Sequence, residues 1–487
     1  MRVNRLLEAR AVDMPRKTAL VSGGERYTYA GLDEQARAFG RLLRDGGIRP
    51  GDRVAICLEN SADTVIAIFG ALKAGAAFFV VNPQARLEYR NQVIRDSGAA
   101  AVVGRDVSGT PAITRITNPR RSSAPAVDDD LAALVYTSGS TGTPKGVMLT
   151  HRNLTFAAGS ICSYLQNTED DVILSVLPLS FTYGLGQVMT AFHAGATLVL
   201  ERSFTYPQAV LDTMRRERVT GFPIVPTIAT LLLQQDLRLH GLTHLRYLTN
   251  AAAALPVSKT RRLRAVFPRA EIFLMYGLTE CQRVSYLPPE LVDECPQSVG
   301  IPIPGTGADV VDDAGRPARP GEIGELVVRG PHIMRGYWND TAATAHVLGR
   351  DPHTGETLLH TGDLFRTDAK GLLHFVERRD DVIKVRGEKV APRHVEEVIA
   401  RLPGVAEVSV YGVPDELSGE AVAAAVKPCD GVRLTADQVR RHCLEHLEPY
   451  MVPRVVDVRT ALPTTPNGKV SRRALRLLTL PRGETAA

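Results

Sequence analysis

Residues 134–146 read LVYTSGSTGTPKG, and this stretch decides the fold because it joins an apolar strand to a turn suited to an anion. Its glycines let the backbone approach an anion without a clash from a Cβ atom. Its hydroxyl groups and Lys145 supply the hydrogen-bond donors that a polyphosphate needs. Pro144 stands where a phosphate loop of the kinase and GTPase type requires glycine, so that class is excluded. The stretch therefore predicts a phosphate-binding turn between a buried strand and a helix that opens at Thr150.

Apolar strands and amphipathic helices alternate on both sides of this turn, up to about residue 275. Strands are expected at 54–56, 78–81, 134–136, 173–176 and 272–275. Ser61 can cap the helix between the first two strands. The order strand, helix, strand favours parallel pairing, so we expect an α/β fold with a large N-terminal domain of several subdomains, parallel-rich sheets and helices. A polar stretch between 108 and 130 is expected to be a connector.

The character of the sequence changes near Arg379. An amphipathic helix is expected over 395–402, and alternating apolar and polar residues predict a half-exposed strand over 407–410. A capping box at 435–438 opens another helix. We therefore expect two domains, residues 1–379 and a small α+β domain over 380–487.

Composition narrows the classes of protein. The 487 residues are too many for one compact core. Lys and Arg exceed Asp and Glu by 58 − 53 = 5, a weak bias that does not call for nucleic acid. The six cysteines show neither CxxC nor zinc spacing, which favours free thiols in a reducing cytosol. Lys73 and glycines interrupt the longest apolar stretch, and no signal-peptide core is present, so we expect a cytoplasmic protein without a membrane span.

The glycine-rich stretch resembles the signature loop of the adenylate-forming superfamily, which comprises acyl-CoA synthetases, peptide-synthetase adenylation domains and luciferase. Further segments resemble the motifs of that family and follow in its order: MYGLTE at 275–280, GEIGEL at 321–326, RGY at 335–337, TGDL at 361–364, RRDDVIKVRG at 378–387 and PNGK at 466–469. The resemblance covers nearly the whole chain and is closest to an acyl-CoA synthetase. It implies that ATP activates a carboxylic acid as an acyl-adenylate while pyrophosphate leaves.

The resemblance also implies roles for individual residues. It assigns nucleotide binding to Thr137, Ser138, Gly139, Ser140, Thr141, Gly142, Lys145, Tyr276, Asp363 and Arg378. It assigns catalysis to Thr279, Glu280 and Lys469. Glu280 would be the Mg²⁺ ligand, since this hard cation takes carboxylate and phosphate oxygens. Lys469 would bridge the attacking carboxylate and the phosphate.

A second half-reaction, in which a thiol displaces AMP, is implied as well. The family rotates its small domain between the two steps, and Asp380 occupies the place of the hinge. In the rotated state Gly387 would line the thiol tunnel. We expect CoA as the acceptor, with the phosphopantetheine of a carrier protein as the alternative. Glu377 stands where the family usually has glycine.

The resemblance places the acid pocket at Phe181, Thr182, Tyr183, Val225, Asn250, Ala251, Ala252 and Gly277. Relatives that activate amino acids usually carry Asp at the position of Thr182. A buried ammonium without its carboxylate is costly, so we favour a fatty or aryl acid over an amino acid. A non-catalytic nucleotide-binding scaffold would be expected to have damaged motifs, yet Lys145, Glu280, Asp363 and Lys469 are all present. A luciferase-like monooxygenase has no marker of oxygen chemistry in this chain.

Overall fold

The computed structural model describes the chain except for residues 106–110, 116–130, 139–143, 238–240, 386–387, 416–417, 465–469 and 480–487. Packing divides it into two compact units. The first comprises Met1–Asp309 and Val327–Thr361, and the second comprises Val310–Leu326 and Gly362–Ala487. No helix of the described residues is long and apolar enough to cross a membrane.

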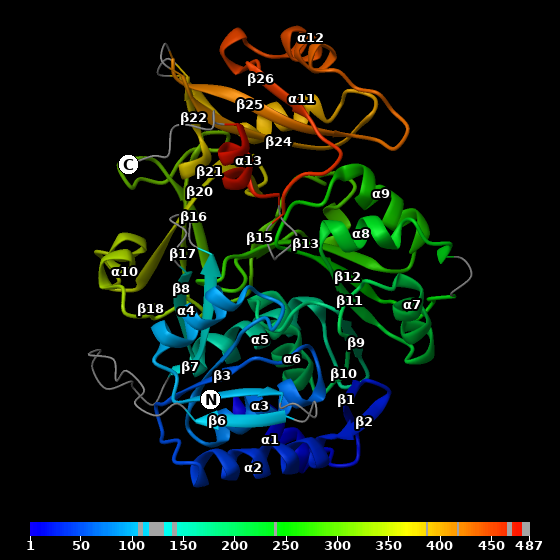
Figure 1. Ribbon diagram of the computed structural model, residues 1–487, viewed down its shortest axis with the longest axis vertical. Helices are drawn as coiled ribbons and strands as arrows, with labels where there is room; N and C mark the ends of the chain where they lie inside the picture. Colours follow the sequence, from blue (N-terminus) through cyan, green and yellow to red (C-terminus); the bar gives the residue numbers. More distant parts are fainter. Residues whose placement is uncertain are drawn as a thin grey trace. The chain divides into compact units, whose positions relative to one another are not determined.

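The first unit contains a large sheet whose central strands are parallel (Figure 1). Its order is β15 (Ile301–Pro302), β14 (Ser285–Tyr286), β13 (Glu271–Tyr276), β12 (Tyr247–Asn250), β11 (Gly221–Ile224), β9 (Val172–Ser175), β10 (Thr197–Leu200), β1 (Thr18–Ser22) and β2 (Glu25–Thr28). The strands from β13 to β1 all run parallel. Their carboxyl ends therefore lie along one edge of the sheet.

The second sheet of this unit contains the strand that leads into the glycine-rich turn. Its order is β18 (Gly336–Tyr337), β8 (Pro144–Thr150), β7 (Leu131–Ser138), β4 (Ala77–Val80), β3 (Arg53–Ile56), β5 (Ala101–Arg105) and β6 (Pro111–Arg115). The turn joins β7 to an antiparallel β8, a strand that the sequence analysis did not anticipate before the helix. The expectation of a plain connector over 108–130 was wrong for residues 111–115, which form β6 and pair with β5, and the rest of that span lies outside the described residues.

Helices fill the space around and between these sheets. Their bounds are α1 (Asn4–Asp13), α2 (Tyr29–Asp45), α3 (Ala62–Lys73), α4 (Leu87–Ser97), α5 (His151–Leu165), α6 (Thr182–Ala194), α7 (Pro207–Arg216), α8 (Pro226–Leu232), α9 (Val257–Val266) and α10 (Thr341–Val347). Ser61 caps α3 as expected, and Thr150 caps α5 in a capping box with Asn153. One buried cluster joins residues of α2, α3 and α6 to strands of both sheets, so the two sheets share a core.

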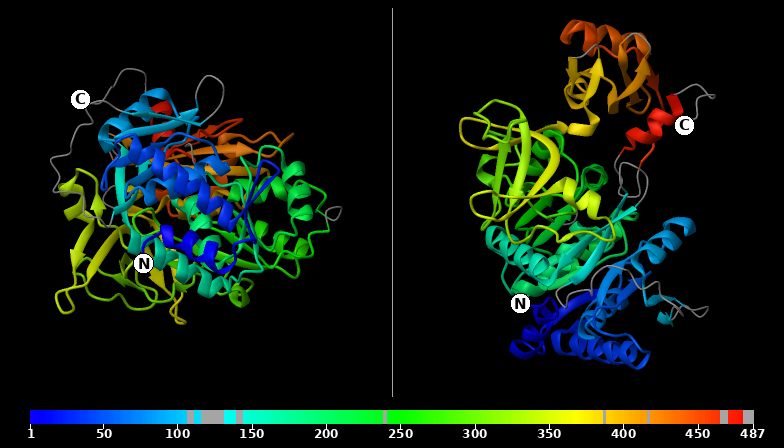
Figure 2. Two further views of the ribbon diagram at one scale, coloured as in Figure 1. Left: turned by 90° about the horizontal axis from the view of Figure 1, so that it is seen from below. Right: turned by 90° about the vertical axis from the view of Figure 1, so that its left-hand side faces the viewer.

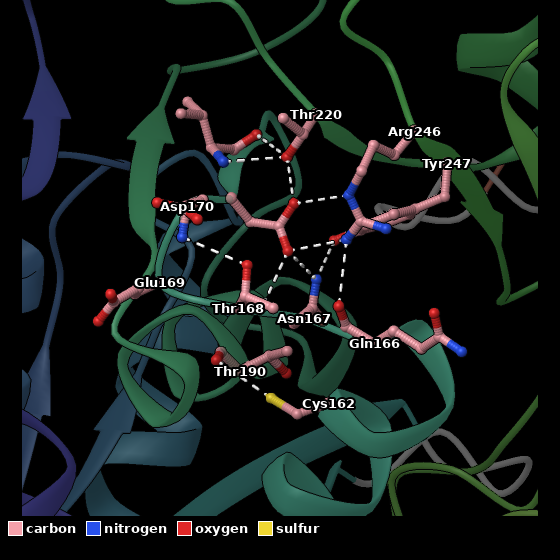
Figure 3. A network of polar contacts seen from close by, with 12 residues as sticks. Cys162, Gln166, Asn167, Thr168, Glu169, Asp170, Thr190, Thr220, Arg246 and Tyr247 are labelled. Carbon is pink, nitrogen blue, oxygen red and sulfur yellow. Dashed lines mark hydrogen bonds and ion pairs between the residues drawn. The ribbon is translucent and has the colours of Figure 1, made fainter.

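Polar side chains tie together the amino ends of three parallel strands (Figure 3). Asp171, next to β9, accepts hydrogen bonds from Arg246 Nε at 3.0 Å and Arg246 Nη2 at 2.8 Å. It also accepts from Thr220 Oγ1 at 2.6 Å and from Asn167 Nδ2 at 3.2 Å. Burial alone raises the pKa of Asp171, but these hydrogen bonds, that of Arg246 foremost, bring it below its ordinary value. The loops before β9, β11 and β12 are thereby fixed to one another.

The second unit contains a smaller sheet with the order β23 (Glu388–Val390), β22 (Ile383–Val385), β25 (Gly419–Pro428) and β24 (Val405–Asp415), in which β26 (Val455–Val458) pairs with β25. Its helices are α11 (Pro392–Ile399), α12 (Ala436–His446) and α13 (Arg472–Thr479). Figure 2 shows the long orange strands β24 and β25 with α12 beside them. The capping box expected at Thr435 and Gln438 is confirmed.

Two details of this unit differ from expectation. Helix α11 ends at Ile399 rather than near 402. In strand β24, Glu407 is exposed as expected, but Ser409 is buried rather than exposed. Val410 packs in a cluster with α11 and α12, while Tyr411 and Val413 pack with Leu475 of α13 on the opposite face. Both faces of β24 are covered from Ser409 to Val413, so the alternation of residue types did not predict the burial of this part.

A further sheet has the order β16 (Gly307–Val311), β17 (Gly324–Arg329), β20 (Thr357–Thr367) and β19 (Leu348–Arg350), with β21 (Leu373–Arg378) paired to β20. Strand β21 precedes the expected domain boundary at 379, yet it packs with the second unit. A hinge at Asp380, which lies exposed in the short helix η3 (Arg379–Asp381), stays a prediction.

Candidate active site

The residues expected to form the acid pocket come from elements that follow the parallel strands. Phe181 precedes α6, whose first residues are Thr182 and Tyr183. Val225 follows β11, Asn250 ends β12, and Gly277 follows β13. The strands β11, β12 and β13 are neighbours in the sheet, so they bring these last residues to its carboxyl edge. In open α/β sheets this edge is where ligands bind.

Several polar groups at this edge have their positions fixed by short contacts. Tyr183 Oη donates to the backbone oxygen of Thr249 at 2.9 Å and lies 2.8 Å from Thr249 Oγ1. Asn250 Nδ2 donates to the backbone oxygen of Ala253 at 2.9 Å. Asn250 Oδ1 is buried and has no hydrogen-bond partner among the described residues. Ala252 follows with φ at 71°, a left-handed conformation that residues with a side chain seldom adopt. The edge therefore holds an unused acceptor beside a strained backbone.

Gly277 is required by the path of the chain after β13. A Cβ atom at this position would lie 2.3 Å from the backbone oxygen of Gln282, which is far too close. The loop from Gly277 to Gln282 turns back on itself, and the backbone N–H of Val284 donates to the oxygen of Tyr276 at 2.9 Å. This compact loop carries Thr279 and Glu280 at the carboxyl edge of the sheet.

The structure brings Glu280 and Lys145 together through Tyr337. Tyr337 Oη donates to Glu280 Oε1 at 2.8 Å, and Lys145 Nζ lies 5.2 Å from the centre of the Tyr337 ring. Strand β18 pairs with β8, so Tyr337 stands opposite Val147, two residues from Lys145. The backbone N–H of Met334 also donates to the oxygen of Glu280 at 2.7 Å. One phenol thus connects the expected metal ligand to the expected phosphate-binding lysine.

Sequence reasoning noticed Tyr337 only as part of the RGY segment and gave it no role. Its position beside two other site residues was hidden because it is 57 positions away from Glu280. The turn itself is only partly visible. Thr137 pairs with Lys145 across β7 and β8, at the base of the turn. Gly139, Ser140, Thr141 and Gly142 lie outside the described residues, and so does the side chain of Ser138.

In the second unit, Asp363 and Arg378 are neighbours on paired strands. They stand opposite each other in the register of β20 and β21, and Arg378 Nε donates to Asp363 Oδ1 at 2.9 Å. Glu325 Oε1 accepts the backbone N–H of Gly362 at 2.9 Å, which fixes the bend before Asp363. Lys469 and Gly387, expected to serve the two half-reactions, lie outside the described residues.

Glu377, which departs from the family pattern, is buried, and its carboxylate oxygens both accept hydrogen bonds. Its carboxylate accepts the backbone N–H groups of Arg378 at 3.0 Å and Arg393 at 2.8 Å. Arg472 Nη1 donates to it at 3.0 Å, and the same guanidinium reaches Asp381 at 2.8 Å and Glu396 at 3.0 Å. Arg472 therefore ties β21 to η3 and α11. No sequence motif pointed to a role for this residue.

Two domain families match the chain. Residues 7–338 match the model of the AMP-binding enzymes, and residues 394–469 match that of the AMP-binding enzyme C-terminal domain. A feruloyl-CoA synthase from Amycolatopsis sp is 34% identical over 485 residues, covering 96% of this chain and 97% of that protein. A long-chain-fatty-acid–CoA ligase from Bacillus subtilis (strain 168) is 29% identical, covering 96% and 93%.

Solved structures agree with these matches. ATP-bound MatB from Rhodopseudomonas palustris superposes with a TM-score of 0.87 at 29% identity, covering 98% of this chain and 99% of that one. The o-succinylbenzoate CoA synthetase from Bacillus subtilis, in complex with its acyl-adenylate, gives 0.84 at 28% identity, covering 97% and 98%.

The fold and the matched domains define a class of enzymes that form acyl-adenylates, and the chain belongs to the AMP-binding enzyme family. Within it, this chain is an AMP-forming acid–thiol ligase of the acyl-CoA synthetase type, which uses ATP and CoA.

Proposed function

We propose that this enzyme activates an aryl or fatty acid with ATP and transfers the acyl group to CoA, using the carboxyl edge of the large sheet as its acid-binding region. The observation that carries the proposal is that Tyr337 contacts both Glu280 and Lys145. Through this ring, a carboxylate that can bind a metal cation is linked to an ammonium group that can bind phosphate. The names of the relatives, feruloyl-CoA synthase and long-chain-fatty-acid–CoA ligase, favour an aryl or long-chain acyl group.

The chemistry joins two anions, so the site must offset their repulsion before a bond can form. Glu280 fits a hard cation such as Mg²⁺, because its carboxylate accepts one hydrogen bond from Tyr337 and keeps further lone pairs for metal coordination. When bound, Mg²⁺ would neutralise charge on the phosphates. Tyr337 orients the Glu280 carboxylate, Lys145 offers its ammonium to the β- and γ-phosphates, and Thr279 donates to the α-phosphate.

We assign the remaining nucleotide contacts to Tyr276, Asp363 and Lys469. Tyr276 offers its ring to adenine. Asp363 accepts the ribose hydroxyls, and Arg378 restrains its carboxylate through the 2.9 Å hydrogen bond. Lys469 stabilises the charge that develops as the acid attacks the α-phosphate. Such preorganised donors act where charge appears in the transition state.

In the second step a thiol attacks the acyl carbon and AMP leaves. We assign the hinge between the two steps to Asp380 and the thiol tunnel to Gly387. CoA is the proposed acceptor, and the phosphopantetheine of a carrier protein is the alternative. Glu377 and Arg472 would limit the motion, because their ion pair joins segments on both sides of Asp380.

Two assays test this proposal. Pyrophosphate exchange measured across aryl, fatty and amino acids should respond to the first two classes and not to the third. AMP release should then require CoA, and a panel of carrier proteins should not replace it. Exchange only with amino acids, or AMP release only with carriers, would contradict the assignment.

A further inference from the structure

Arg283 is a buried cation in the loop that follows Glu280. The residue is 4% exposed. Its guanidinium carbon lies 5.1 Å from the centre of the Tyr183 ring, at the start of α6. Tyr183 is in turn hydrogen-bonded to Thr249, the residue before Asn250. Arg283 therefore lies among the residues that we assign to the acid pocket.

No anion compensates this charge within the described part of the chain. Arg283 forms no ion pair there, and its Nε atom has no hydrogen-bond partner. Its electrostatic neighbours are phenols: burial raises the pKa of Tyr183 to about 12 and that of Tyr164 higher still. Both phenols are uncharged at neutral pH. The guanidinium thus faces aromatic rings and no carboxylate.

Three other arginines of the described residues, one fully buried and two half-buried, have acceptors. Arg53 donates to the backbone oxygens of Ser97 at 2.9 Å and Gly98 at 2.8 Å, although it also stacks on a ring. Arg472 reaches three carboxylates. Arg246 is paired with Asp171. A buried charge is costly unless it is paired and hydrogen-bonded. The half-buried Arg90 and Arg476 also have an Nε atom without a partner, but of the two fully buried arginines among the described residues, Arg53 has acceptors and Arg283 has none.

We propose that Arg283 determines substrate specificity by binding a second carboxylate of the acid, so that the preferred substrate is a dicarboxylic acid. This inference rests on the proposed acid activation and refines its substrate class. A guanidinium presents paired donors that match a carboxylate in one plane, and the neighbouring rings of Tyr183 and Tyr164 suit the carbon skeleton of the acid.

The contacts favour the acid over the nucleotide as the partner of Arg283. Arg283 contacts Tyr183, which leads to Thr249 and the carboxyl end of β12. Glu280, in contrast, contacts Tyr337 and through it Lys145, the residues that we assign to the phosphates. The two groups of contacts share no residue. A distal carboxylate at Arg283 therefore does not compete with the assigned phosphate ligands.

Matched acid pairs test the inference. Terephthalate is compared with 4-methylbenzoate, and suberate with octanoate, by pyrophosphate release at saturating ATP. The wild type should prefer at least one dicarboxylate by roughly 100-fold in kcat/KM over its partner, because a site with a buried polar group rejects a ligand that leaves it unpaired. Arg283→Met should abolish this preference, and Arg283→Lys should keep part of it. The KM for ATP should not change.

Controls separate specificity from folding. Arg261→Met, an exposed arginine on α9, should leave the preference unchanged. The midpoint of thermal unfolding of Arg283→Met should stay or rise, since the variant removes an unpaired buried charge. A fall of several degrees would mark Arg283 as structural and overturn the inference.

Two further outcomes are equally decisive. The inference would also be overturned if the wild type used both members of each acid pair equally. A raised KM for ATP in Arg283→Met with the acid preference intact would overturn it as well. In both cases the proposed acid activation would stand. If no acid of the aryl, fatty or dicarboxylic classes supports pyrophosphate release, the proposed function fails and this inference fails with it.

Discussion

The two ends of the same parallel strands differ in how their polar groups are satisfied. At the amino end, Asp171 is buried and accepts hydrogen bonds from Arg246, Thr220 and Asn167. At the carboxyl end, Asn250 Oδ1 and Arg283 Nε are buried without partners among the described residues. The carboxylate at the amino edge is thus paired with a cation, although Asn167 Oδ1 there also lacks a partner, whereas the cation at the carboxyl edge has no counter-ion among the described residues. Satisfied networks rigidify a fold, whereas unsatisfied buried groups mark places where binding can be favourable.

This contrast predicts that substitutions at the carboxyl edge lower activity, and that substitutions at the amino edge lower stability. The largest effect is expected for Glu280→Gln, which keeps the shape of the side chain and removes its charge. We expect kcat to fall by roughly 10²–10³-fold, similar to the loss of other single groups that stabilise transition-state charge. Pyrophosphate-exchange rates at several Mg²⁺ concentrations measure the loss.

Glu290→Gln, an exposed change in η2 (Pro289–Leu291), is the matched control and should leave kcat unaltered. A Glu280→Gln enzyme that keeps full activity, or one that simply unfolds, would remove the assigned role of the carboxylate.

Asp171→Ala tests the amino edge. Removing the carboxylate leaves Arg246 partly buried without its ion-pair partner, so we expect about 3 kcal/mol of destabilisation. Calorimetric unfolding should show the loss, while kcat per folded molecule stays close to that of the wild type. Asp170→Ala, at the exposed neighbouring position, is the control. A large loss of kcat with unchanged stability would reverse the comparison.

The same residue predicts the pH dependence of unfolding. The pKa of Asp171 is below its ordinary value in the folded state. Its contribution to stability is therefore present above the unfolded pKa, near pH 4, and is lost as the pH falls through the lower folded pKa. The wild type should lose stability more steeply below about pH 4 than Asp171→Ala. If the stability of both proteins falls equally steeply with pH in this acidic range, Asp171 does not control the acid unfolding.

Tyr337→Phe should have a smaller effect on activity. The variant removes the hydrogen bond that orients Glu280 but keeps the ring beneath Lys145. Loss of a group that orients a metal ligand typically lowers metal affinity or activity by about 10- to 100-fold, and we expect a loss near the lower limit. The apparent Mg²⁺ affinity should weaken together with kcat/KM for ATP. An unchanged Mg²⁺ dependence would separate Tyr337 from the metal site.

The smallest effect is expected for Ala252→Gly. Ala252 has φ at 71°, and a left-handed conformation costs a residue with a Cβ atom roughly 1 kcal/mol. Glycine removes this cost but gains freedom in the unfolded chain, so the net stabilisation should be below about 1 kcal/mol. Thermal unfolding of Ala252→Gly beside the exposed Ala253→Gly measures it. A clear destabilisation would mean that the methyl group packs against a required neighbour.

Local features of the fold were predicted well from the sequence. Ser61, Thr150 and Thr435 cap helices as expected, because a cap is decided by residues within one turn of helix. Strands such as β3 and β13 also lie where the apolar segments placed them. The pairing of strands was harder to predict from the sequence. The antiparallel β8 and the edge strand β6 depend on partners elsewhere in the chain, which local periodicity does not reveal.

The sequence by itself determined the family, the order of its motifs and the chemical type of the groups at the site, since these reside in short runs of residues. Only the tertiary structure decided that Tyr337 joins Glu280 to Lys145, and that Glu377 is the buried partner of Arg472. It also decided that Arg283 is a cation without a counter-ion among the described residues. The physical reason is separation along the chain: Glu280 and Tyr337 are 57 positions apart, and Glu377 and Arg472 are 95 positions apart. Burial and charge pairing are set where such distant segments meet.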